Sequence, residues 1–576
     1  MPEFKHDLSV VLCGEAGQGI QTVEGLFTRL CKLANFNVFA TKEYMSRVRG
    51  GLNSTSLRIA SSPVNAYEKR IDLLLPLSPG SLRHLNKRLS ATTIVIGEKE
   101  NIESSELPKG AVAIDAPLSQ IAKEAGSPLF SNTVAVGILS GLLGMDFALL
   151  EGLLKKQFAK KEEKVITGNL TAAKRGYELG EGWIKAGTIK MVLKPDATVK
   201  DQIVVSGVDA MALGALAGGC NFLAAYPMTP ATGILTFLSQ QAHELGIVVE
   251  QAEDEISAIN MALGAGYAGA RAMVSTAGGG FALMNEGVGL AGMIEQPIVI
   301  AVGQRPAPAT GLPTRTEQGD LNLVVYSGHG EFPRLVLAPG SIEEAFSLTQ
   351  RAFNLADKFQ IPVFVLFDQY LGDSYYNLAA FDLKNIPFQS SVIETQEGYR
   401  RYVLTKDGVS PRGVPGLGSG MVLADSDEHD ESGHITEDLD LRVKMVDKRL
   451  KKGAGLEKDS IGPELIGDPN SSALIVEWGS NKLLVAEALQ RLSASGKLKE
   501  KVAQLHFSQV FPVPPQAESL IQKAKKIILV ENNATGQFNN LIKLAFGREA
   551  DQLILQYNGL PFDVETLSEK IKEALK

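Results

Sequence analysis

Cysteine is scarce in this chain, which has three among 576 residues, at Cys13, Cys31 and Cys220. They lie far apart, and no CxxC pair is present. Since an iron–sulfur cluster is generally held by four cysteine thiolates, we predict no cluster and no other metal site within this chain. The three thiols are predicted to be buried and inert.

Long apolar runs are also absent. No uninterrupted stretch reaches the roughly 18 apolar residues of a membrane-spanning helix, and the first residues, MPEFKHDLSVVL, do not resemble a signal peptide. The formal net charge of −8 argues against binding to nucleic acid, because phosphate binding calls for a basic surface. We therefore expect a cytoplasmic protein that neither spans a membrane nor binds nucleic acid.

Glycine, by contrast, is abundant, with 57 residues, many of which follow apolar runs directly. This arrangement is typical of loops in α/β proteins. A single hydrophobic core stops growing at roughly 250–300 residues, so the chain is expected to form several domains. Changes in composition along the chain predict four segments, at residues 1–190, 200–385, 386–467 and 468–576.

Residues 200–385 have the clearest pattern, because short apolar runs alternate with helical periodicity. Examples are a strand at 221–226 before a helix at 232–245, and a helix at 255–267 before a strand at 272–276. Alternation of this kind predicts a doubly wound parallel sheet with helices on both faces.

The other three segments differ in character. Residues 1–190 open with a strand, a glycine loop and a helix, which form one βα unit, and residues 468–576 have α/β texture again. Both are predicted to be α/β domains. Residues 386–467 are rich in acidic residues, glycine and proline, so we predict an ordered excursion or lid there.

Several long motifs in a fixed order give the chain a resemblance to a known family. They include YPMTPAT from Tyr226, EDEISAINMALGAGYAGARAM from Glu253, STAGGGFALM from Ser275, TGLPTRTEQGDL ending at Leu321 and VENNATGQ from Val530. The chain resembles the α subunit of 2-oxoacid:ferredoxin oxidoreductases, especially the 2-oxoglutarate type. The first segment resembles that family's γ domain, and the last is similar to the transketolase C-terminal domain. Ala16 and Met228 depart from the family's usual residues, without removing an obvious chemical group.

The resemblance implies an enzyme subunit that uses thiamine diphosphate, coenzyme A and ferredoxin. No GDG motif with a downstream asparagine, the signature of a thiamine diphosphate–Mg²⁺ site, is found in the sequence. In the family that motif and the cluster cysteines lie on a separate β subunit, so the resemblance implies such a partner, with Mg²⁺ and [4Fe–4S], in an αβ pair doubled to a heterotetramer.

The substrate and the function leave alternatives open. 2-Oxoglutarate is the first expectation, and pyruvate or a branched-chain 2-oxoacid is the alternative. A scaffold subunit whose pocket has decayed, and a self-sufficient enzyme of transketolase type, are the competing functions. The missing diphosphate motif argues against the latter.

Three side chains match functional positions of the family. Glu255 matches the glutamate that activates thiamine by binding its pyrimidine ring; taken locally, an acid in a first helical turn is explained by the helix dipole. Thr229 matches a threonine that faces substrate and cofactor, although it also fits a helix N-cap before Pro230. Arg305 matches the arginine that binds the substrate carboxylate through two parallel hydrogen bonds, whereas composition alone favours a surface loop residue.

Weaker candidates surround these three. Arg315 and His329 are predicted to contact substrate, because 2-oxoglutarate has a second carboxylate; Arg334 is a further possibility of the same kind. Gly278 and Gly279 follow a strand and open a helix, where glycine allows either close approach of a cofactor or tight strand–helix packing.

The glycine loop GEAGQG lies in the first segment and has the spacing GxxGxG. Backbone N–H groups in such a loop can bind phosphate, and the family resemblance suggests coenzyme A. The predicted contacts are Gly14, Gly17 and Gly19, with charge supplied by Arg47 and Arg49. A purely structural turn is the alternative.

Overall fold

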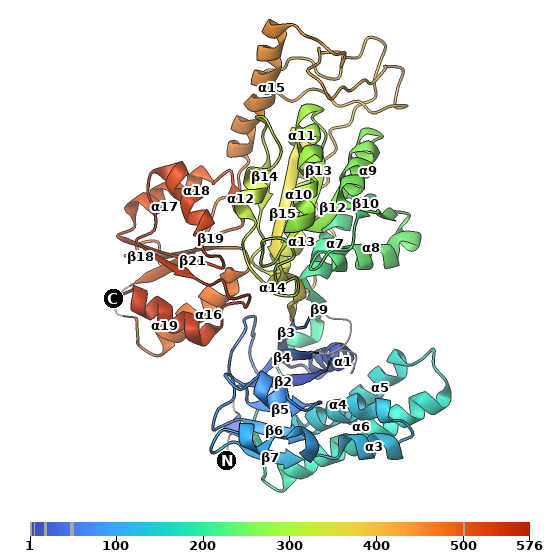
Figure 1. The fold of residues 1–576 in the computed structure, drawn as a ribbon, viewed down its shortest axis with the longest axis vertical. Helices are drawn as coiled ribbons and strands as arrows, with labels where there is room; N and C mark the ends of the chain where they lie inside the picture. The colour runs from blue at the N-terminus through green and yellow to red at the C-terminus, as the bar shows by residue number, and fades with distance from the viewer. Residues whose placement is uncertain (1–2, 5, 16–19, 47–50, 499–500) are drawn as a thin grey trace. The chain divides into compact units, whose positions relative to one another are not determined.

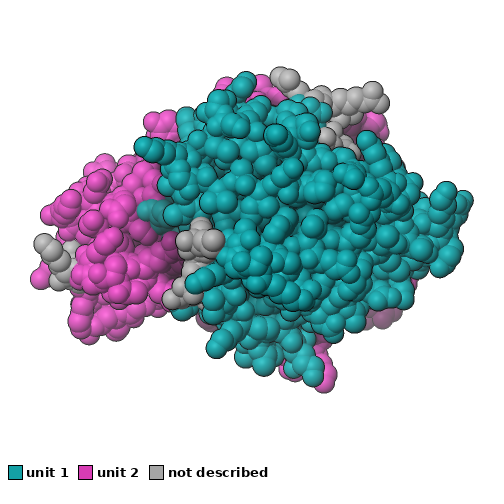
Figure 2. Space-filling view, turned by 90° about the horizontal axis from the view of Figure 1, so that it is seen from below, with its two compact units in different colours: residues 1–205, 374–380, 563–565 teal, residues 206–373, 381–562, 566–576 magenta. Residues whose placement is uncertain are grey.

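The computed structural model spans residues 1–576 and describes all of them except 1–2, 5, 16–19, 47–50 and 499–500 (Figure 1). The chain divides into two compact units, coloured separately in Figure 2. Unit 1 comprises Met1–Val205, Ser374–Ala380 and Asp563–Glu565, and unit 2 comprises Ser206–Asp373, Phe381–Phe562 and Thr566–Lys576. The finer division into four segments stays a prediction.

Unit 1 is built on a mixed eight-stranded sheet in the order β7-β6-β5-β2-β4-β3-β16-β9. The central strand β2 pairs parallel with β5 and antiparallel with β4. The last residues of the second predicted segment return to this sheet, since β16 pairs antiparallel with β3. The strands are β2 (Asp7–Glu15), β3 (Asn37–Glu43), β4 (Leu52–Ala60), β5 (Leu73–Pro76), β6 (Ile94–Gly97), β7 (Val112–Asp115), β9 (Gln202–Ser206) and β16 (Tyr375–Ala379), with β1 (Glu3–Phe4) and β8 (Lys190–Met191) forming a separate pair.

Most helices of unit 1 bury their apolar faces in one core with the sheet, whereas Leu82 of α2 belongs to a smaller cluster with Val11 and Leu74. Helix α1 follows the glycine loop, as predicted, and presents Val23, Phe27 and Leu30 to this core. The helices are α1 (Ile20–Leu33), α2 (Ser81–His84), α3 (Leu118–Glu124), α4 (Ser131–Leu142), α5 (Phe147–Gln157) and α6 (Glu163–Lys185).

Unit 2 contains the predicted parallel sheet, in the order β11-β10-β12-β13-β15-β14-β20. All neighbours pair parallel except β20, which comes from the last segment and runs antiparallel to β14. Strands β12, β13 and β15 are buried along their whole length, as expected for a sheet covered on both faces. The strands are β10 (Phe222–Ala225), β11 (Val248–Gln251), β12 (Ala272–Ala277), β13 (Ile298–Gln304), β14 (Leu335–Leu337), β15 (Pro362–Asp368) and β20 (Gln509–Phe511).

The helices of this part confirm the alternating pattern. The helices expected at 232–245 and 255–267 are present with those bounds as α8 and α9. The helices around the seven-stranded sheet are α7 (Gly207–Ala217), α8 (Thr232–Leu245), α9 (Glu255–Tyr267), α10 (Gly278–Leu283), α11 (Asn285–Met293), α12 (Leu321–Val325), α13 (Ile342–Phe359) and α14 (Gln369–Asp373).

A second sheet in unit 2 has the order β17-β19-β18-β21-β22, with β17 from residues 386–467 and the other four strands from residues 468–576. It is parallel apart from β17, and its apolar residues share one core with the seven-stranded sheet. The predicted α/β class is therefore confirmed. The elements are β17 (Glu464–Ile466), β18 (Ala473–Trp478), β19 (Val502–Phe507), β21 (Lys526–Glu531), β22 (Gln552–Leu555), α16 (Asn481–Ala494), α17 (Glu518–Lys523), α18 (Gln537–Phe546) and α19 (Val564–Ala574).

The predicted excursion at 386–467 consists of irregular loops followed by helix α15 (Leu439–Lys458). We call it the insert. In Figure 1 its loops and α15 extend from one end of unit 2, beyond α11. It has buried side chains of its own, among them Tyr402, His429 and Met445.

Within the described part of the chain, no helix combines the length and apolar character needed to cross a membrane.

Helices α4 and α6 approach each other closely because glycines line their contact. A Cβ atom added at Gly176 would collide with the carbonyl oxygen of Val134, and one at Gly180 with that of Ile138. Gly137 and Gly141 face α6 in the same way. Small residues thus set the distance between the two helix axes.

We expect Gly176→Ala to lower the free energy of unfolding by about 1–3 kcal/mol, because the added methyl group must displace backbone atoms. Gly182→Ala is the matched control in the same helix, since its Cβ would meet no atom within 4 Å. There alanine should stabilise the helix by up to about 1 kcal/mol. Denaturant unfolding of both variants tests the packing, and equal effects would contradict it.

Candidate functional site

Four sequence-predicted residues of unit 2 lie at the carboxyl edge of the seven-stranded sheet. Thr229 lies in the loop after β10, Glu255 follows β11, Gly278 follows β12 and Arg305 follows β13. These four strands are neighbours and run parallel, so their carboxyl ends share one edge. This is where open α/β sheets bind ligands.

Glu255 is the first residue of α9 and is buried, with 3% of its surface exposed. The helix cap is supplied by its neighbour Asp254, whose Oδ1 accepts a hydrogen bond from the N–H of Ser257 at 2.7 Å. Oε1 of Glu255 is buried and has no hydrogen-bond partner within the described residues. Burial raises the pKa of this carboxyl above its usual range. The helix cap is therefore Asp254, and Glu255 lies in the first turn of α9.

The first turn of α10 is packed against two carboxyl groups. A Cβ atom at Gly280 would collide with the carboxylate of Glu255 and the hydroxyl of Thr276, and one at Gly278 would collide with the carboxylate of Asp320. A Cβ atom added at Gly279 would lie 3.7 Å from the carbonyl oxygen of Ala309, which is an ordinary contact distance. Glycine at 278 and 280 is thus required to seat these two acids.

Arg305 and Thr229 are joined directly. Nη1 of Arg305 donates a hydrogen bond to the backbone oxygen of Thr229 at 2.7 Å. Pro230, linked to Thr229 by a cis peptide bond, packs on Gly303. Helix α8 starts at Thr232 with Ala231 as its N-cap and without a side-chain cap. The alternative interpretation of Thr229 as a helix cap is therefore wrong.

Asp320 is an acid of this edge that lies in the motif TGLPTRTEQGDL but is not among the predicted site residues. It is 6% exposed, and its backbone N–H donates to Oε1 of Gln304 at 3.1 Å. Its Oδ2 has no hydrogen-bond partner among the described residues. Burial, with a smaller contribution from Glu317, raises the pKa of Asp320 to about 7, although Arg305 opposes the rise.

The loop before Asp320 is held by the last segment. The N–H of Gln318 donates to the backbone oxygen of Asn532 at 2.7 Å, and its Nε2 donates to that of Trp478 at 2.9 Å. Nδ2 of Asn533 donates to the backbone oxygen of Gln318 at 2.9 Å. The motif VENNATGQ therefore fixes the loop that carries Asp320.

Glu531 in the same motif is fully buried. Its Oε1 accepts hydrogen bonds from Nε1 of Trp478 at 3.1 Å, Nδ2 of Asn533 at 2.7 Å and the N–H of Phe538 at 2.9 Å. Burial raises the pKa of Glu531 to about 7. These bonds give the glutamate a structural role beside the loop.

The weaker candidates have different surroundings. His329 is exposed, and Arg315 is half-buried with its stem beside Gly559. Arg334 is buried and bonded through Nη1 to Ser327, and burial lowers its pKa to about 10. Its contacts within the fold account for it without a ligand.

The predicted coenzyme A contacts are only partly visible. Gly14 lies in β2 opposite Asn53 of β4. Gly17, Gly19, Arg47 and Arg49 lie outside the described residues. Their role stays a prediction.

All three cysteines are buried and free, as predicted. Burial raises the pKa of Cys13 to about 11 and that of Cys220 to about 12, and it raises the pKa of Cys31 as well. The reactive thiolate form is thus disfavoured at each position.

Two protein-family models match the chain. The model described as pyruvate flavodoxin/ferredoxin oxidoreductase, thiamine diP-bdg, matches residues 213–448, and the model pyruvate ferredoxin/flavodoxin oxidoreductase matches residues 9–179. Together they cover most of the chain and include both the strand edge described above and the glycine-loop domain.

Full-length relatives agree with these models. The 2-oxoacid:ferredoxin oxidoreductase subunit alpha of Sulfolobus sp is 32% identical over 99% of this chain and 97% of the relative. The 2-oxoglutarate oxidoreductase subunit KorA of Mycobacterium tuberculosis is 28% identical over 99% of this chain and 92% of its own length.

A solved structure resembles the whole fold. It is a 2-oxoglutarate:ferredoxin oxidoreductase from Magnetococcus marinus, with a TM-score of 0.91 and 32% identity over 99% of this chain and 100% of that chain. The matches define an oxidoreductase subunit that contains a domain of the thiamine diphosphate-binding type. The chain belongs to the 2-oxoacid:ferredoxin oxidoreductase family, as an alpha subunit.

We expect Asp320→Asn to alter the pH dependence of thermal stability. The pKa of about 7 in the folded protein exceeds the value of about 3.9 for a free aspartate. The stabilising contribution of protonated Asp320 is therefore complete below about pH 4 and is lost as the pH rises to about 7. Asparagine stays neutral, so the melting temperature of the variant relative to wild type should rise between about pH 4 and pH 7 and then level off.

Thermal melts at several pH values measure this difference. Asp201→Asn, which changes an exposed aspartate, controls for the loss of one surface charge. Parallel pH curves for Asp320→Asn and wild type would contradict the assignment.

Proposed function

We propose that this chain is the pyrimidine-side subunit of a coenzyme A-dependent oxidoreductase that acts on 2-oxoglutarate or a closely related 2-oxoacid. The observation that carries the proposal is the buried carboxylate of Glu255, whose Oε1 has no partner within the described residues, at the edge where Arg305 and Thr229 meet. Two similar proteins support this substrate class. The M. tuberculosis relative is named a 2-oxoglutarate oxidoreductase subunit, and the M. marinus structure contains 2-oxoglutarate, coenzyme A and succinyl-CoA.

The overall reaction would convert a 2-oxoacid, coenzyme A and oxidised ferredoxin reversibly into acyl-CoA, CO₂ and reduced ferredoxin. A separate β subunit would supply the Mg²⁺ and diphosphate site and the [4Fe–4S] cluster, because this sequence lacks the motifs for both. We propose a cytoplasmic αβ pair doubled by two-fold symmetry. The chain would be inactive alone.

The residues of the strand edge fit the pyrimidine of thiamine. Glu255 offers a buried acceptor oxygen without a partner among the described residues, and Gly280 leaves the space that this carboxylate needs. Thiamine diphosphate, when bound, supplies the electron sink for decarboxylation. Glu255 would hold a proton between its carboxyl and the pyrimidine ring nitrogen, and its raised pKa favours such proton sharing.

Arg305 and Thr229 would bind the substrate. Only Nη1 of Arg305 is engaged by the Thr229 backbone oxygen, and a guanidinium has five N–H donors, so donors remain for the 2-oxoacid carboxylate. The Thr229 hydroxyl would face the 2-oxo group, and Gly278 and Gly279 would contact the cofactor. Arg315 and His329 are proposed for the second carboxylate of 2-oxoglutarate.

The first segment would bind coenzyme A. Gly14, Gly17 and Gly19 would approach its phosphates with their backbone N–H groups, and Arg47 and Arg49 would supply positive charge. The match of residues 9–179 to the oxidoreductase family model supports a functional domain here.

Glu255→Gln in the assembled complex should lower turnover about 10²- to 10⁴-fold, the usual range for losing a proton-transfer group. Glutamine keeps the shape of the side chain but cannot exchange the proton. Glu253→Gln is the matched control, because Glu253 is exposed two residues earlier. Ferredoxin reduction gives the rates. Near-wild-type turnover in Glu255→Gln would favour the scaffold alternative.

Arg305→Met should reduce kcat/KM for the 2-oxoacid about 10- to 100-fold, the value of hydrogen bonds to a charged group. Arg305→Lys should recover part of the loss, since lysine keeps the charge without the planar pair of donors. Assays of the wild-type complex with 2-oxoglutarate, pyruvate and 2-oxoisovalerate test specificity. A clear preference for pyruvate or 2-oxoisovalerate would replace 2-oxoglutarate as the substrate.

A further inference from the structure

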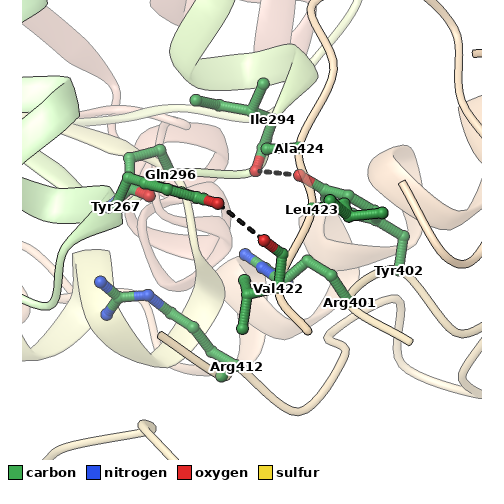
Figure 3. A pocket seen from close by; sticks show the side chains of 10 residues that line it. Tyr267, Ile294, Gln296, Arg401, Tyr402, Arg412, Val422, Leu423 and Ala424 are labelled. Carbon is green, nitrogen blue, oxygen red and sulfur yellow. Dashed lines mark hydrogen bonds between the residues drawn. The ribbon is translucent and has the colours of Figure 1, made fainter. Parts of the chain in front are cut away.

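The insert meets the seven-stranded domain at the C-terminal ends of α9 and α11. These helices follow parallel strands and run back across the sheet, so their C-termini lie at the edge opposite the candidate active site. The hydroxyl of Tyr402 donates to the backbone oxygen of Ile294 at 3.2 Å, and that of Tyr267 donates to the backbone oxygen of Val422 at 2.7 Å (Figure 3).

A small cavity lies at this junction. Its volume of about 10 Å³ gives room for about one water-sized particle. The helix ends contribute Tyr267, Ile294 and Gln296, and the insert contributes its remaining lining, chiefly Arg401, Tyr402 and Arg412. Most of these side chains are already engaged with one another or with backbone oxygens.

Arg401 has an unused donor at the cavity. The residue is 5% exposed, its Nη2 donates to the backbone oxygen of Glu295 at 2.9 Å, and its guanidinium lies 4.9 Å from the centre of the Tyr402 ring. Nη1 is buried and has no hydrogen-bond partner among the described residues. Figure 3 shows this guanidinium pointing toward the middle of the lining residues.

Arg412 points elsewhere. Its Nη1 donates to Asp357 at 2.6 Å and its Nη2 to the backbone oxygen of Gly266 at 2.8 Å. Arg271 also pairs with Asp357, at 3.3 Å. Asp357 thus serves two guanidinium groups.

Positive charge exceeds negative charge around the cavity. Lys448 and Lys452 both pair with Glu295, at 2.5 and 2.6 Å, and Arg401 bonds to the backbone of the same residue. The carboxylate of Glu428 forms ion pairs with Arg442 and Arg449. The five cations Arg271, Arg401, Arg412, Lys448 and Lys452 therefore face two carboxylates and two helix C-termini, each worth about half a negative charge.

The two carboxylates and the two helix C-termini together balance about three of these five positive charges, so about two stay uncompensated. Burial, with a smaller contribution from the neighbouring cations, lowers the pKa of Lys452 to about 8 and also lowers that of Lys448, although Glu295 opposes both shifts. A water molecule in the cavity would satisfy the donor of Arg401 but would not balance the charge.

We propose that the cavity binds one inorganic anion of chloride size, with Nη1 of Arg401 as its principal donor. The small volume of about 10 Å³ favours a monatomic ion over an oxyanion. The ion would link the insert to the ends of α9 and α11. The anion cavity lies at the edge of the sheet opposite the candidate active site. A test of anion binding therefore does not depend on which substrate the enzyme uses.

Crystals of the assembled complex grown in sodium bromide give the direct test. An anomalous bromide peak within hydrogen-bond distance of Arg401 Nη1 is expected in wild type and is expected to be lost in Arg401→Gln. Arg400→Gln is the matched control, because Arg400 is exposed and pairs with Glu431 outside the cavity. A cavity that holds only water in wild-type crystals overturns the proposal.

Hydrogen exchange of the same complex in solution gives a second readout. At a chloride concentration about ten times the Kd, amides of residues 401–424 should exchange about tenfold more slowly than in sodium gluconate of equal ionic strength. Arg400→Gln should behave as wild type, and Arg401→Gln should show no difference between the salts. Equal rates in both salts for wild type refute the anion site, whether or not Arg401→Gln folds.

Discussion

The organisation of the candidate site starts from the buried carboxyl group of Glu255, whose Oε1 has no hydrogen-bond partner among the described residues. Leaving a buried polar group unsatisfied costs about 1–3 kcal/mol, so the surroundings must hold Glu255 in place. Asp254 caps α9, Gly280 leaves room for the carboxylate, and Thr276 borders it. Such costs are concentrated at functional sites, which agrees with the role that we propose for this residue.

The last segment contributes to the site through the loop that it holds. Gln318 is bonded on several sides to backbone and side-chain atoms around Trp478, Asn532 and Asn533, and Asp320 follows two residues later. The two sheets of unit 2 also share one core. The position of Asp320 against Gly278 therefore depends on how the two sheets pack together.

The insert shows how composition can mislead about burial. Its composition predicts an ordered excursion or lid instead of a core, yet α15 buries Lys448 and Lys452 almost completely against Glu295. Lysine is seldom fully buried unless it is paired, and the pairing residue lies about 150 positions away in the sequence. Local composition carries no information about such a partner.

The amino-acid sequence was enough to predict the α/β class, the alternation of strands and helices in unit 2 and the positions of Thr229, Glu255 and Arg305 after the strands β10, β11 and β13. Those features follow from apolar periodicity and from motifs that are contiguous in the chain. The contacts of Asp320 with Gly278, of Glu255 with Gly280 and of Arg401 with the end of α11 became known from the three-dimensional fold. The physical reason is that these contacts join residues far apart in the chain, where neither spacing nor propensity specifies the partner.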